Sequence, residues 1–348
     1  MTGLSSEVWT LVGIPRIRKR FIRVELRKDP ITQSWVIQDQ GERLWQQIDV
    51  CPLCPGQESY CPQTICALPQ GQANWQVRVV PHLWPLYQIE GDAQRAGEGI
   101  YDKMRNLGAH EIVIEHPNHH LPLSQQSVEQ VALVLQAYVA RSTDLRKDPR
   151  FRYVNVFRNQ GALAGQDLEH PHSQIIATPF IPRRVGYELR STKRYFEMKE
   201  RCLICDCVEQ ELKQQVRVVE ADEQFVAFCP FASRVPYETW VLPIQHSSSF
   251  EQNLVLWERQ LQFARLLKSV LQRLEAVTRA YHLVLHTSPS IPPKSERMGN
   301  WETLEEDYHW HFEILPIVPS KSKSYSLKEV YYNSLLPETA AEELLRVV

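Results

Sequence analysis

The stretch Leu168-Glu-His-Pro-His-Ser-Gln-Ile-Ile-Ala177 carries the sharpest pattern in the chain. Alternate residues of a strand face the same way, so His170 and His172 are expected to project together from one face. The proline between them stiffens the link. A neutral imidazole nitrogen is a competent nucleophile towards phosphorus. The pattern therefore predicts His172 as a nucleophile in group transfer, with His170 fixing the backbone that presents it.

A second stretch of this kind, His309-Trp-His-Phe-Glu-Ile-Leu-Pro316, lies near the other end of the chain. Each His-x-His closes one copy of a repeated order of features, with a period of about 150 residues, and a repeat of that size indicates duplicated domains. Each copy opens with a Cys-x-x-Cys, namely Cys51 with Cys54 and Cys202 with Cys205.

Between these two features, each copy has strand-like segments and one long amphipathic stretch. The strand-like segments include Trp75–Val80 and Tyr237–Leu242. The helical stretches are Ser127–Leu145 and Leu254–Leu274. Because strands and helices do not alternate regularly, we expect an α+β fold with two tandem domains, antiparallel sheets and packed helices. The expected divisions are a basic arm at 1–24 and domains at 25–190 and 191–348.

The totals agree with such a protein and exclude several classes. A chain of 348 residues suffices for two domains, at roughly 100–200 residues each. The net charge of −2 gives no global sign of a nucleic-acid partner. No apolar run approaches the ~20 residues of a membrane helix, and the N-terminus lacks a secretory signal. We expect a cytoplasmic protein without nucleic-acid or membrane partners. In the basic arm, the stretch Arg16–Arg23 is expected to form a solvated charged face. The alternative for this stretch is a contact with lipid or nucleic acid.

Cysteine and histidine spacing predicts two metal sites. Structural zinc takes four Cys and His ligands, often a Cys-x-x-Cys plus two His from elsewhere. Four protein ligands leave no position for water, so both Zn²⁺ ions are expected to stabilise the fold only. Alternatives are one four-cysteine site, redox dithiols or hydrogen-bonded core histidines. The predicted ligands are Cys51, Cys54, His119 and His170 in the first half, and Cys202, Cys205, His246 and His309 in the second.

Polar groups near the first His-x-His are candidates to bind phosphate. Stabilising the charge that develops on phosphoryl oxygens supplies most of the acceleration in such reactions. The candidates are Asn159, the backbone of Gly161 and Gly165, Ser173 and Gln174.

Taken together, these motifs resemble the galactose-1-phosphate uridylyltransferase family of the histidine-triad superfamily, including its ADP-glucose phosphorylase branch. The resemblance runs from about Glu25 to the C-terminus. It implies two histidine-triad-like domains, a possible homodimer, and a two-step exchange through a nucleotidyl-histidine. The motifs that carry it are Leu26-Arg-Lys-Asp-Pro-Ile-Thr32, Trp35-Val-Ile37, Cys51-Pro-Leu-Cys-Pro-Gly56, Val156-Phe-Arg-Asn-Gln-Gly-Ala162, Leu168–Ala177 and Pro337-Glu-Thr-Ala-Ala341.

The resemblance also implies roles for single residues. The family nucleophile falls on His172, and the phosphate-contacting Gln and Asn fall on Gln174 and Asn159. The first zinc site falls on the first predicted set of ligands, and the second Cys-x-x-Cys resembles the phosphorylase branch. In the uridylyltransferase branch a Glu and three His hold a second metal instead, and the matching rival set here is Glu188, His286, His309 and His311.

The chain departs from the family pattern in the pocket that selects base and sugar. Asp167 stands where the family has a phosphate-contacting Ser, and His82 stands where it has an Asn. Arg43 is the only arginine left in a stretch that is Arg-rich in the family. The glycine-rich turn before Asn333, in the tail that helps hold the sugar, is replaced. We count all four positions among the predicted substrate-binding residues.

The sequence thus predicts an enzyme that moves a nucleoside monophosphate through His172, with Gln174 as a second catalytic residue. The donor is a nucleoside-diphosphate hexose, and the acceptor is a hexose 1-phosphate or phosphate. Galactose-1-phosphate uridylyl transfer is the default form, and ADP-glucose phosphorolysis is the nearest alternative. A non-enzymatic nucleotide-binding protein and a hydrolase are the further alternatives.

Overall fold

The structure is a computed structural model, and it describes residues 24–39, 50–71, 74–290, 299–319 and 330–347. Two of the predictions concern residues outside these ranges. They are the character of the basic arm before Val24 and the substrate contact of Arg43.

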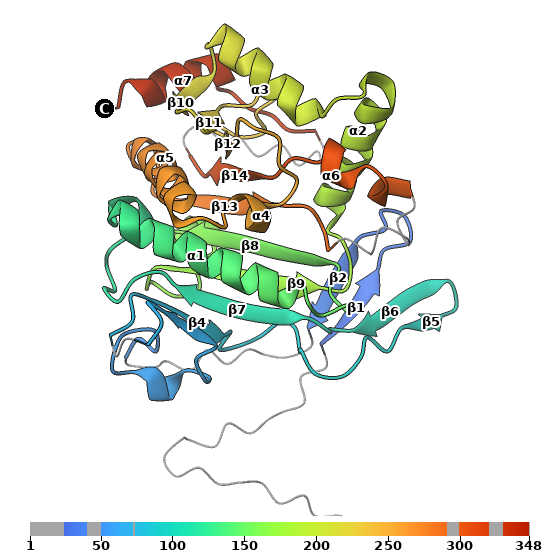
Figure 1. Ribbon diagram of the computed structural model, residues 1–348. Coiled ribbons are helices and arrows are strands. Elements are labelled where there is room, and N and C mark those ends of the chain that lie inside the picture. Colours follow the sequence, from blue (N-terminus) through green and yellow to red (C-terminus); the bar gives the residue numbers. More distant parts are fainter. Residues whose placement is uncertain (1–23, 40–49, 72–73, 291–298, 320–329, 348) are drawn as a thin grey trace, which may run out of the picture.

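In the described part of the chain, ten strands form one antiparallel sheet, in the order β10-β11-β12-β14-β13-β8-β9-β7-β4-β3 (Figure 1). Five of these strands come from the first half: β3 (Cys66–Leu68), β4 (Val77–Pro81), β7 (Ala109–Ile114), β8 (Tyr153–Gln160) and β9 (His172–Thr178). The other five come from the second half: β10 (Val218–Ala221), β11 (Phe225–Phe228), β12 (Thr239–Pro243), β13 (Tyr281–His286) and β14 (His311–Pro316).

The large sheet consists of two copies of one strand order. Outward from the middle, the first half runs β8-β9-β7-β4-β3 and the second runs β13-β14-β12-β11-β10. The copies meet where β8 pairs with β13, with Asn159 opposite His282. This pairing leaves neither copy with an open edge at the join. The predicted α+β fold is confirmed, and the structure adds that the two halves share one continuous sheet.

Two long helices cover one face of this sheet and pack against each other (Figure 1). They are α1 (Val128–Leu145) and α5 (Trp257–Glu275). The Ser127 side chain accepts a hydrogen bond from the Gln130 N–H at 3.1 Å, which is the usual way to satisfy a free amide at a helix start. Buried residues of both helices belong to the main hydrophobic core. The predicted helical stretches therefore form, although the second begins at Trp257.

The remaining elements lie around the large sheet. A second sheet has the order β2-β1-β6-β5, and its β5–β6 hairpin projects from the side of the molecule (Figure 1). The expected division at residue 190 falls inside helix α2. The bounds are β1 (Val24–Lys28), β2 (Trp35–Asp39), β5 (Ala96–Glu98), β6 (Tyr101–Arg105), α2 (Arg183–Lys199), α3 (Leu203–Gln214), α4 (Phe250–Asn253), α6 (Leu304–Asp307) and α7 (Pro337–Leu345).

Strand β9 presents different side chains to the two faces of the sheet. Ser173 faces helix α1, where its hydroxyl group bonds to the hydroxyl of Tyr138. Successive strand residues point to opposite faces, so His172 and Gln174 share the other face. That face is where the candidate site lies.

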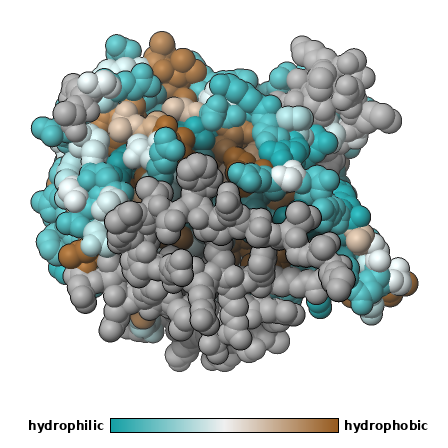
Figure 2. Space-filling view, turned by 90° about the horizontal axis from the view of Figure 1, so that it is seen from below, coloured by the Kyte–Doolittle hydropathy of each residue, from teal (hydrophilic) through white to brown (hydrophobic). Residues whose placement is uncertain are grey.

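Seen from below (Figure 2), the described surface is mostly hydrophilic, with hydrophobic residues scattered over it. Among the helices that the structure describes, none has the length and apolar character needed to cross a membrane.

Candidate functional site

His172 begins strand β9 and is almost fully buried. Its Nδ1 lies 2.8 Å from the carbonyl oxygen of His170. A carbonyl oxygen only accepts, so the ring proton is on Nδ1 and the Nε2 lone pair is free. Burial lowers the pKa of His172 below its usual range, which keeps the ring neutral at pH 7. The side chain therefore has the protonation state of a nitrogen nucleophile.

Gln174 lies two residues further along β9 and is also buried. Its Oε1 is 2.9 Å from Nε2 of His110, on the neighbouring strand β7. The His110 ring stacks on that of His82, with centroids 4.0 Å apart. The structure thus links the predicted residues Gln174 and His82 through His110, which sequence reasoning missed. Its available signal was a histidine within the strand Ala109–Ile114, every residue of which is buried.

Asn159 lies on β8, on the other side of β9. Its Oδ1 is 2.9 Å from Nδ1 of His282, its partner across the β8–β13 pair. Asn159 is therefore held at the join between the two halves, next to the strand that carries His172. His282 is a second neighbour that sequence reasoning did not name.

The loop from β8 to β9 contains three predicted substrate-binding residues. Gly161 and Gly165 have φ values of 82° and 71°, in the left-handed region that favours glycine. The Gly161 N–H donates to Oε1 of Gln166 at 2.7 Å, and the Gly165 N–H donates to the Ala162 carbonyl at 3.0 Å. A phosphoryl oxygen would have to compete with both bonds. Asp167 is exposed, and its negative charge raises the pKa of His172 against the larger effect of burial.

Ser173 is separated from the other predicted phosphate ligands. Its hydroxyl group donates to Glu115 and bonds to Tyr138 on the face covered by α1. Glu115 also accepts a hydrogen bond from Nε of Arg158 at 2.9 Å, and both side chains of that ion pair are buried. This network lies behind β9 and supports the strand from the opposite side. The alternation of strand residues was the signal that would have placed Ser173 there.

Asn333 bonds to backbone groups of the second half. Its Nδ2 donates to the Ser233 carbonyl at 3.1 Å, and its Oδ1 accepts from the Leu335 N–H at 3.0 Å. These contacts place Asn333 in the C-terminal half of the chain.

The first predicted set of metal ligands forms one cluster. The ligand atoms of Cys51, Cys54, His119 and His170 all lie within 4.8 Å of one another. Nδ1 of His170 lies 3.7 Å and 3.5 Å from the two sulfurs, and Nδ1 of His119 lies 3.4 Å from that of Cys54. Tetrahedral zinc bonds of about 2.3 Å to sulfur and about 2.0 Å to nitrogen imply S···N separations of about 3.6 Å. The donor set fits the ion.

The second predicted set forms a separate cluster with the same chemistry. Its members are Cys202, Cys205, His246 and His309. Nδ1 of each histidine lies 3.4 Å from the sulfur of Cys205. Because the two Cys-x-x-Cys pairs lie in different clusters, the alternative of a single four-cysteine site is wrong.

The outer nitrogens of three of these four histidines face hydrogen-bond acceptors. Nε2 of His170 donates to the His116 carbonyl at 2.7 Å, which leaves Nδ1 unprotonated toward the sulfurs. Nε2 of His246 and Nε2 of His309 donate to backbone carbonyls at 2.9 Å and 3.1 Å. Metal-binding histidines almost always have such a partner, which fixes the tautomer and the ring orientation. These two clusters are therefore able to hold metal ions.

A third cluster contains Glu188, His286, His311 and Glu313. The rival set of ligands predicted for the second metal is therefore wrong in one member. His309 lies with the cysteines of the second Cys/His cluster, and Glu313 takes its place in the third cluster. Nδ1 of His286 donates to Glu188 at 3.0 Å. Arginine side chains also enter this cluster: Arg184 contacts both carboxylates at 3.1 Å, and Arg234 contacts Glu313 at 2.6 Å.

The third cluster occupies the position in the second half that corresponds to His172 and Gln174 in the first. His311 repeats the tautomer of His172, since its Nδ1 lies 3.2 Å from the His309 carbonyl. Its ring is fully buried and stacks on Trp240, with centroids 4.7 Å apart. Glu313 replaces Gln174, so the second half offers a carboxylate where the first offers an amide. Among the residues that the structure describes, the two halves therefore differ in the side chain that stands two residues after the second histidine of each His-x-His.

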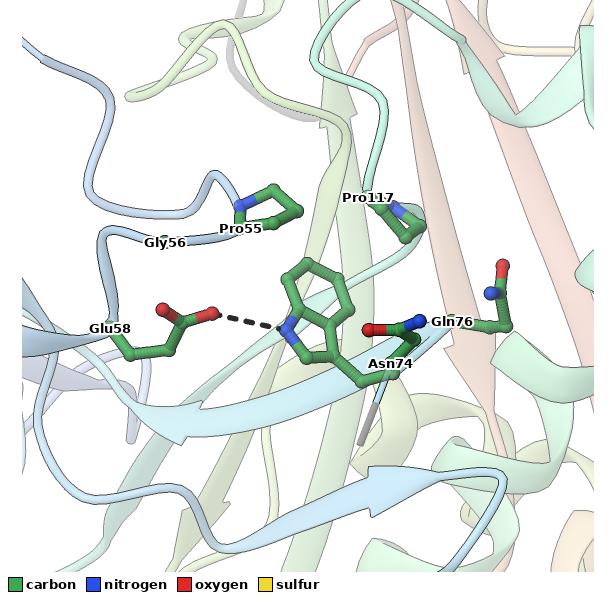
Figure 3. Close-up of a pocket in the computed structure, with 7 residues that line it drawn as sticks. Pro55, Gly56, Glu58, Asn74, Gln76 and Pro117 are labelled. Carbon is green, nitrogen blue, oxygen red and sulfur yellow. Dashed lines mark hydrogen bonds between the residues drawn. The ribbon is translucent and has the colours of Figure 1, made fainter. Parts of the chain in front are cut away.

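A cavity of about 420 Å³ is lined by residues that lie close in sequence to ligands of the first Cys/His cluster, and Figure 3 shows the side chains around it. Pro55 follows Cys54 in the chain, and Pro117 comes two residues before His119. Nε1 of Trp75 donates to Glu58 at 3.2 Å. The lining contains none of the predicted substrate residues: it consists of Pro55, Gly56, Glu58, Asn74, Trp75, Gln76 and Pro117.

Comparison with known families gives two matches that together span most of the chain. Residues 38–182 match the N-terminal domain of galactose-1-phosphate uridyl transferase, and residues 188–344 match its C-terminal domain.

Two curated relatives are similar along nearly their whole length. ADP-glucose phosphorylase of Arabidopsis thaliana is 30% identical over 341 residues, covering 93% of each chain. Galactose-1-phosphate uridylyltransferase of Thermotoga maritima is 27% identical, covering 92% of this chain and 98% of the relative.

Solved structures agree with these matches. A uridylyltransferase structure superposes with a TM-score of 0.76 at 27% identity, covering 93% of this chain and 98% of the other. The structure of the Arabidopsis thaliana ADP-glucose phosphorylase with bound ADP-glucose gives a TM-score of 0.74 at 29% identity, covering 93% and 99%.

Proposed function

The chain belongs to the galactose-1-phosphate uridyl transferase family and is an enzyme of this nucleotidyltransferase kind, and we propose that His172 carries the nucleoside monophosphate. The donor is a nucleoside-diphosphate hexose, and the acceptor is a hexose 1-phosphate or phosphate. The observation that carries this assignment is the bond from Nδ1 of His172 to the His170 carbonyl, which leaves Nε2 as a free lone pair.

The transfer takes two displacements at one phosphorus. In the first, Nε2 of His172 bonds to the α-phosphorus, the bond to the bridging oxygen breaks, and hexose 1-phosphate leaves. In the second, an oxygen of the acceptor attacks that phosphorus and the bond to Nε2 breaks. The proton on Nδ1 stays in its hydrogen bond to the His170 carbonyl throughout. The imidazole therefore needs no separate base.

Gln174 and Asn159 are the proposed polar contacts of the phosphoryl group. Gln174 shares the strand face of His172, and Asn159 lies on the adjacent strand β8. Donors that are already in place for the developing charge require no reorganisation during the reaction. Of the other predicted contacts, Ser173 is assigned to support of β9, because its hydroxyl group is bonded on the opposite face.

The acceptor separates the two leading forms of the reaction. Hexose 1-phosphate as acceptor gives uridylyl transfer, the activity named for the Thermotoga maritima relative. Phosphate as acceptor gives phosphorolysis of ADP-glucose, which is favoured by the Arabidopsis thaliana relative and by the second Cys/His cluster.

A product assay decides between these forms. UDP-glucose or ADP-glucose is incubated with phosphate or with galactose 1-phosphate, and the products are separated by chromatography. Nucleoside-diphosphate galactose formed from labelled galactose 1-phosphate identifies transfer, and ADP formed only with phosphate identifies phosphorolysis. Free nucleoside monophosphate would identify a hydrolase.

Zinc is the proposed metal of both Cys/His clusters. The donor set of two sulfurs and two imidazole nitrogens is the one that structural zinc prefers. Bound there, the ions would tie together distant segments of each half. In the first half this includes His170, so the metal would fix the backbone next to His172.

We also propose a domain division, an oligomeric state and a cellular location for the protein. The two functional units are 25–190 and 191–348, with helix α2 spanning the division between them. The active form is a homodimer, which light scattering of the purified protein would test. The protein acts in the cytoplasm, which imaging of the tagged full-length chain would test.

A further inference from the structure

We propose that His110 is a positioning residue for the transfer reaction. It holds the side chain of Gln174 so that the amide nitrogen, and not the amide oxygen, is offered to the transferred phosphoryl group. This inference rests on the proposed role of His172.

The contact joins two buried side chains on adjacent strands. Nε2 of His110 lies 2.9 Å from Oε1 of Gln174. In the pairing of β7 with β9, Ile112 lies opposite Gln174, and His110 is one step along the same face. Both side chains are at most 6% exposed, so water does not replace their hydrogen bond.

The tautomer of His110 is determined by its second nitrogen. The Leu86 N–H donates to Nδ1 of His110 at 3.1 Å. A nitrogen that accepts carries no proton, so the proton of the neutral ring is on Nε2. That N–H must donate to Gln174, and the amide oxygen must face it. The amide nitrogen, with its two N–H donors, is left on the other side.

The His110 ring is itself held in place. It stacks on His82 with an interplanar angle of 13°. Nδ1 of His82 accepts from the Trp84 N–H at 3.0 Å, so backbone amides of one loop orient both rings. The Asn106 side chain donates to the Leu86 carbonyl at 2.8 Å and fixes the same loop. The loop therefore fixes the orientation of the His110 imidazole, and the imidazole fixes the orientation of the Gln174 amide.

The amide orientation matters because the reacting group is anionic. An N–H donor stabilises charge on a phosphoryl oxygen, whereas a carbonyl oxygen in the same place repels it. An amide that is not held would sample both orientations. The second half differs at this position: Glu313 stands where the first half has Gln174. Its carboxylate is paired with Arg234 at 2.6 Å and lies 3.5 Å from Nε2 of His286, so no amide donor is held there.

The test is a double-mutant cycle with a rescue variant. His110→Leu removes the donor, and His110→Gln places an amide N–H near the position of Nε2. Both are made in the wild-type and Gln174→Ala backgrounds, with metal content and melting temperature measured for each protein. The readout is the rate of nucleotidyl-histidine formation at saturating sugar nucleotide.

We expect His110→Leu to slow adduct formation about 10-fold to 100-fold in the wild-type background, since losing one such donor outright costs about 10²–10³. His110→Gln should recover most of that loss. In the Gln174→Ala background, His110→Leu should have less than about a twofold effect, because residues that act as a unit are not additive.

An equal loss in both backgrounds would overturn the proposal, since it would show that His110 acts on the fold and not through Gln174. Failure of His110→Gln to recover activity in a folded, metal-loaded protein would also contradict it. If the wild type forms no adduct, the proposed function fails first, and the role of His110 falls with it.

Discussion

The carbonyl oxygen of His170 lies 2.8 Å from Nδ1 of His172, and the His170 ring belongs to the first Cys/His cluster. One residue thus connects a metal site to a nucleophile. Nε2 of the His170 ring donates to the His116 carbonyl, and Nδ1 of the same ring faces the cysteine sulfurs. The backbone carbonyl of His170 orients the imidazole of His172. The same relationship recurs between His309 and His311 at 3.2 Å, but there the second ring is buried under Trp240.

Metal content should fall when either cluster loses a sulfur. Cys51→Ser and Cys202→Ser are each expected to lower bound zinc by about one equivalent, because the remaining three ligands no longer form a closed tetrahedral site. Elemental analysis of the dialysed proteins measures this. Cys207→Ser is the matched control, since Cys207 is an exposed cysteine outside both clusters. Wild-type metal content in Cys51→Ser or Cys202→Ser would contradict the assignment.

Activity should separate the two clusters. Cys51→Ser is expected to reduce the rate of adduct formation more than Cys202→Ser, because only the first cluster contains the residue whose carbonyl orients His172. Equal losses in both variants, at equal thermal stability, would show that the link through His170 is not specific.

Glu313 should make a pH-dependent contribution to stability. Burial alone would raise its pKa, but the charges of His286, His311, Arg234 and Arg184 outweigh burial and lower the pKa to about 2. A carboxyl group with a depressed pKa stabilises the fold above its ordinary value near 4.5, and that contribution is lost as the pH falls toward 2. Its size is on the order of 3 kcal/mol.

Glu313→Gln should therefore lower the free energy of unfolding at pH 7 by about this order, and the gap to wild type should narrow between about pH 4.5 and about pH 2. Urea denaturation at several pH values measures it. Glu342→Gln is the control, because its ion pair with Arg346 is exposed and should contribute little. A difference in free energy of unfolding between Glu313→Gln and wild type that does not change with pH would contradict the electrostatic explanation.

Asp167→Ser should tighten sugar-nucleotide binding. The Asp167 carboxylate is close enough to His172 for its charge to raise the pKa of that ring, so it also repels an anionic phosphate placed there. Because Asp167 is exposed, the repulsion is on the order of 1 kcal/mol, or about fivefold in Kd. Calorimetry in the His172→Ala background measures binding without turnover. Unchanged affinity would show that Asp167 lies away from the bound phosphate.

Local chemistry made much of this site predictable. The ligands of both clusters follow from the repeated order of Cys-x-x-Cys and His, because metal geometry restricts which residue types can converge. The start of α1 follows from Ser127, whose side chain satisfies a free amide. Each of these inferences needed only neighbouring residues or a fixed coordination chemistry.

Features set by strand pairing could not be predicted in this way. Nothing in the Asn159 segment specifies that it pairs with the His282 segment, so the single continuous sheet had to be observed. The same holds for His110, whose role depends on β7 lying beside β9. Ser173 was a different case: the alternation along a strand already placed it on the face opposite His172.

The most direct test of the account is the intact mass of the purified protein after incubation with UDP-glucose and, separately, with ADP-glucose. The account predicts one nucleotidyl adduct per chain with one or both donors, absent from His172→Ala. The donor that leaves the adduct identifies the base. An adduct that persists in His172→Ala, or no adduct with either donor in a protein of normal metal content, would contradict the assignment of His172 as the nucleophile.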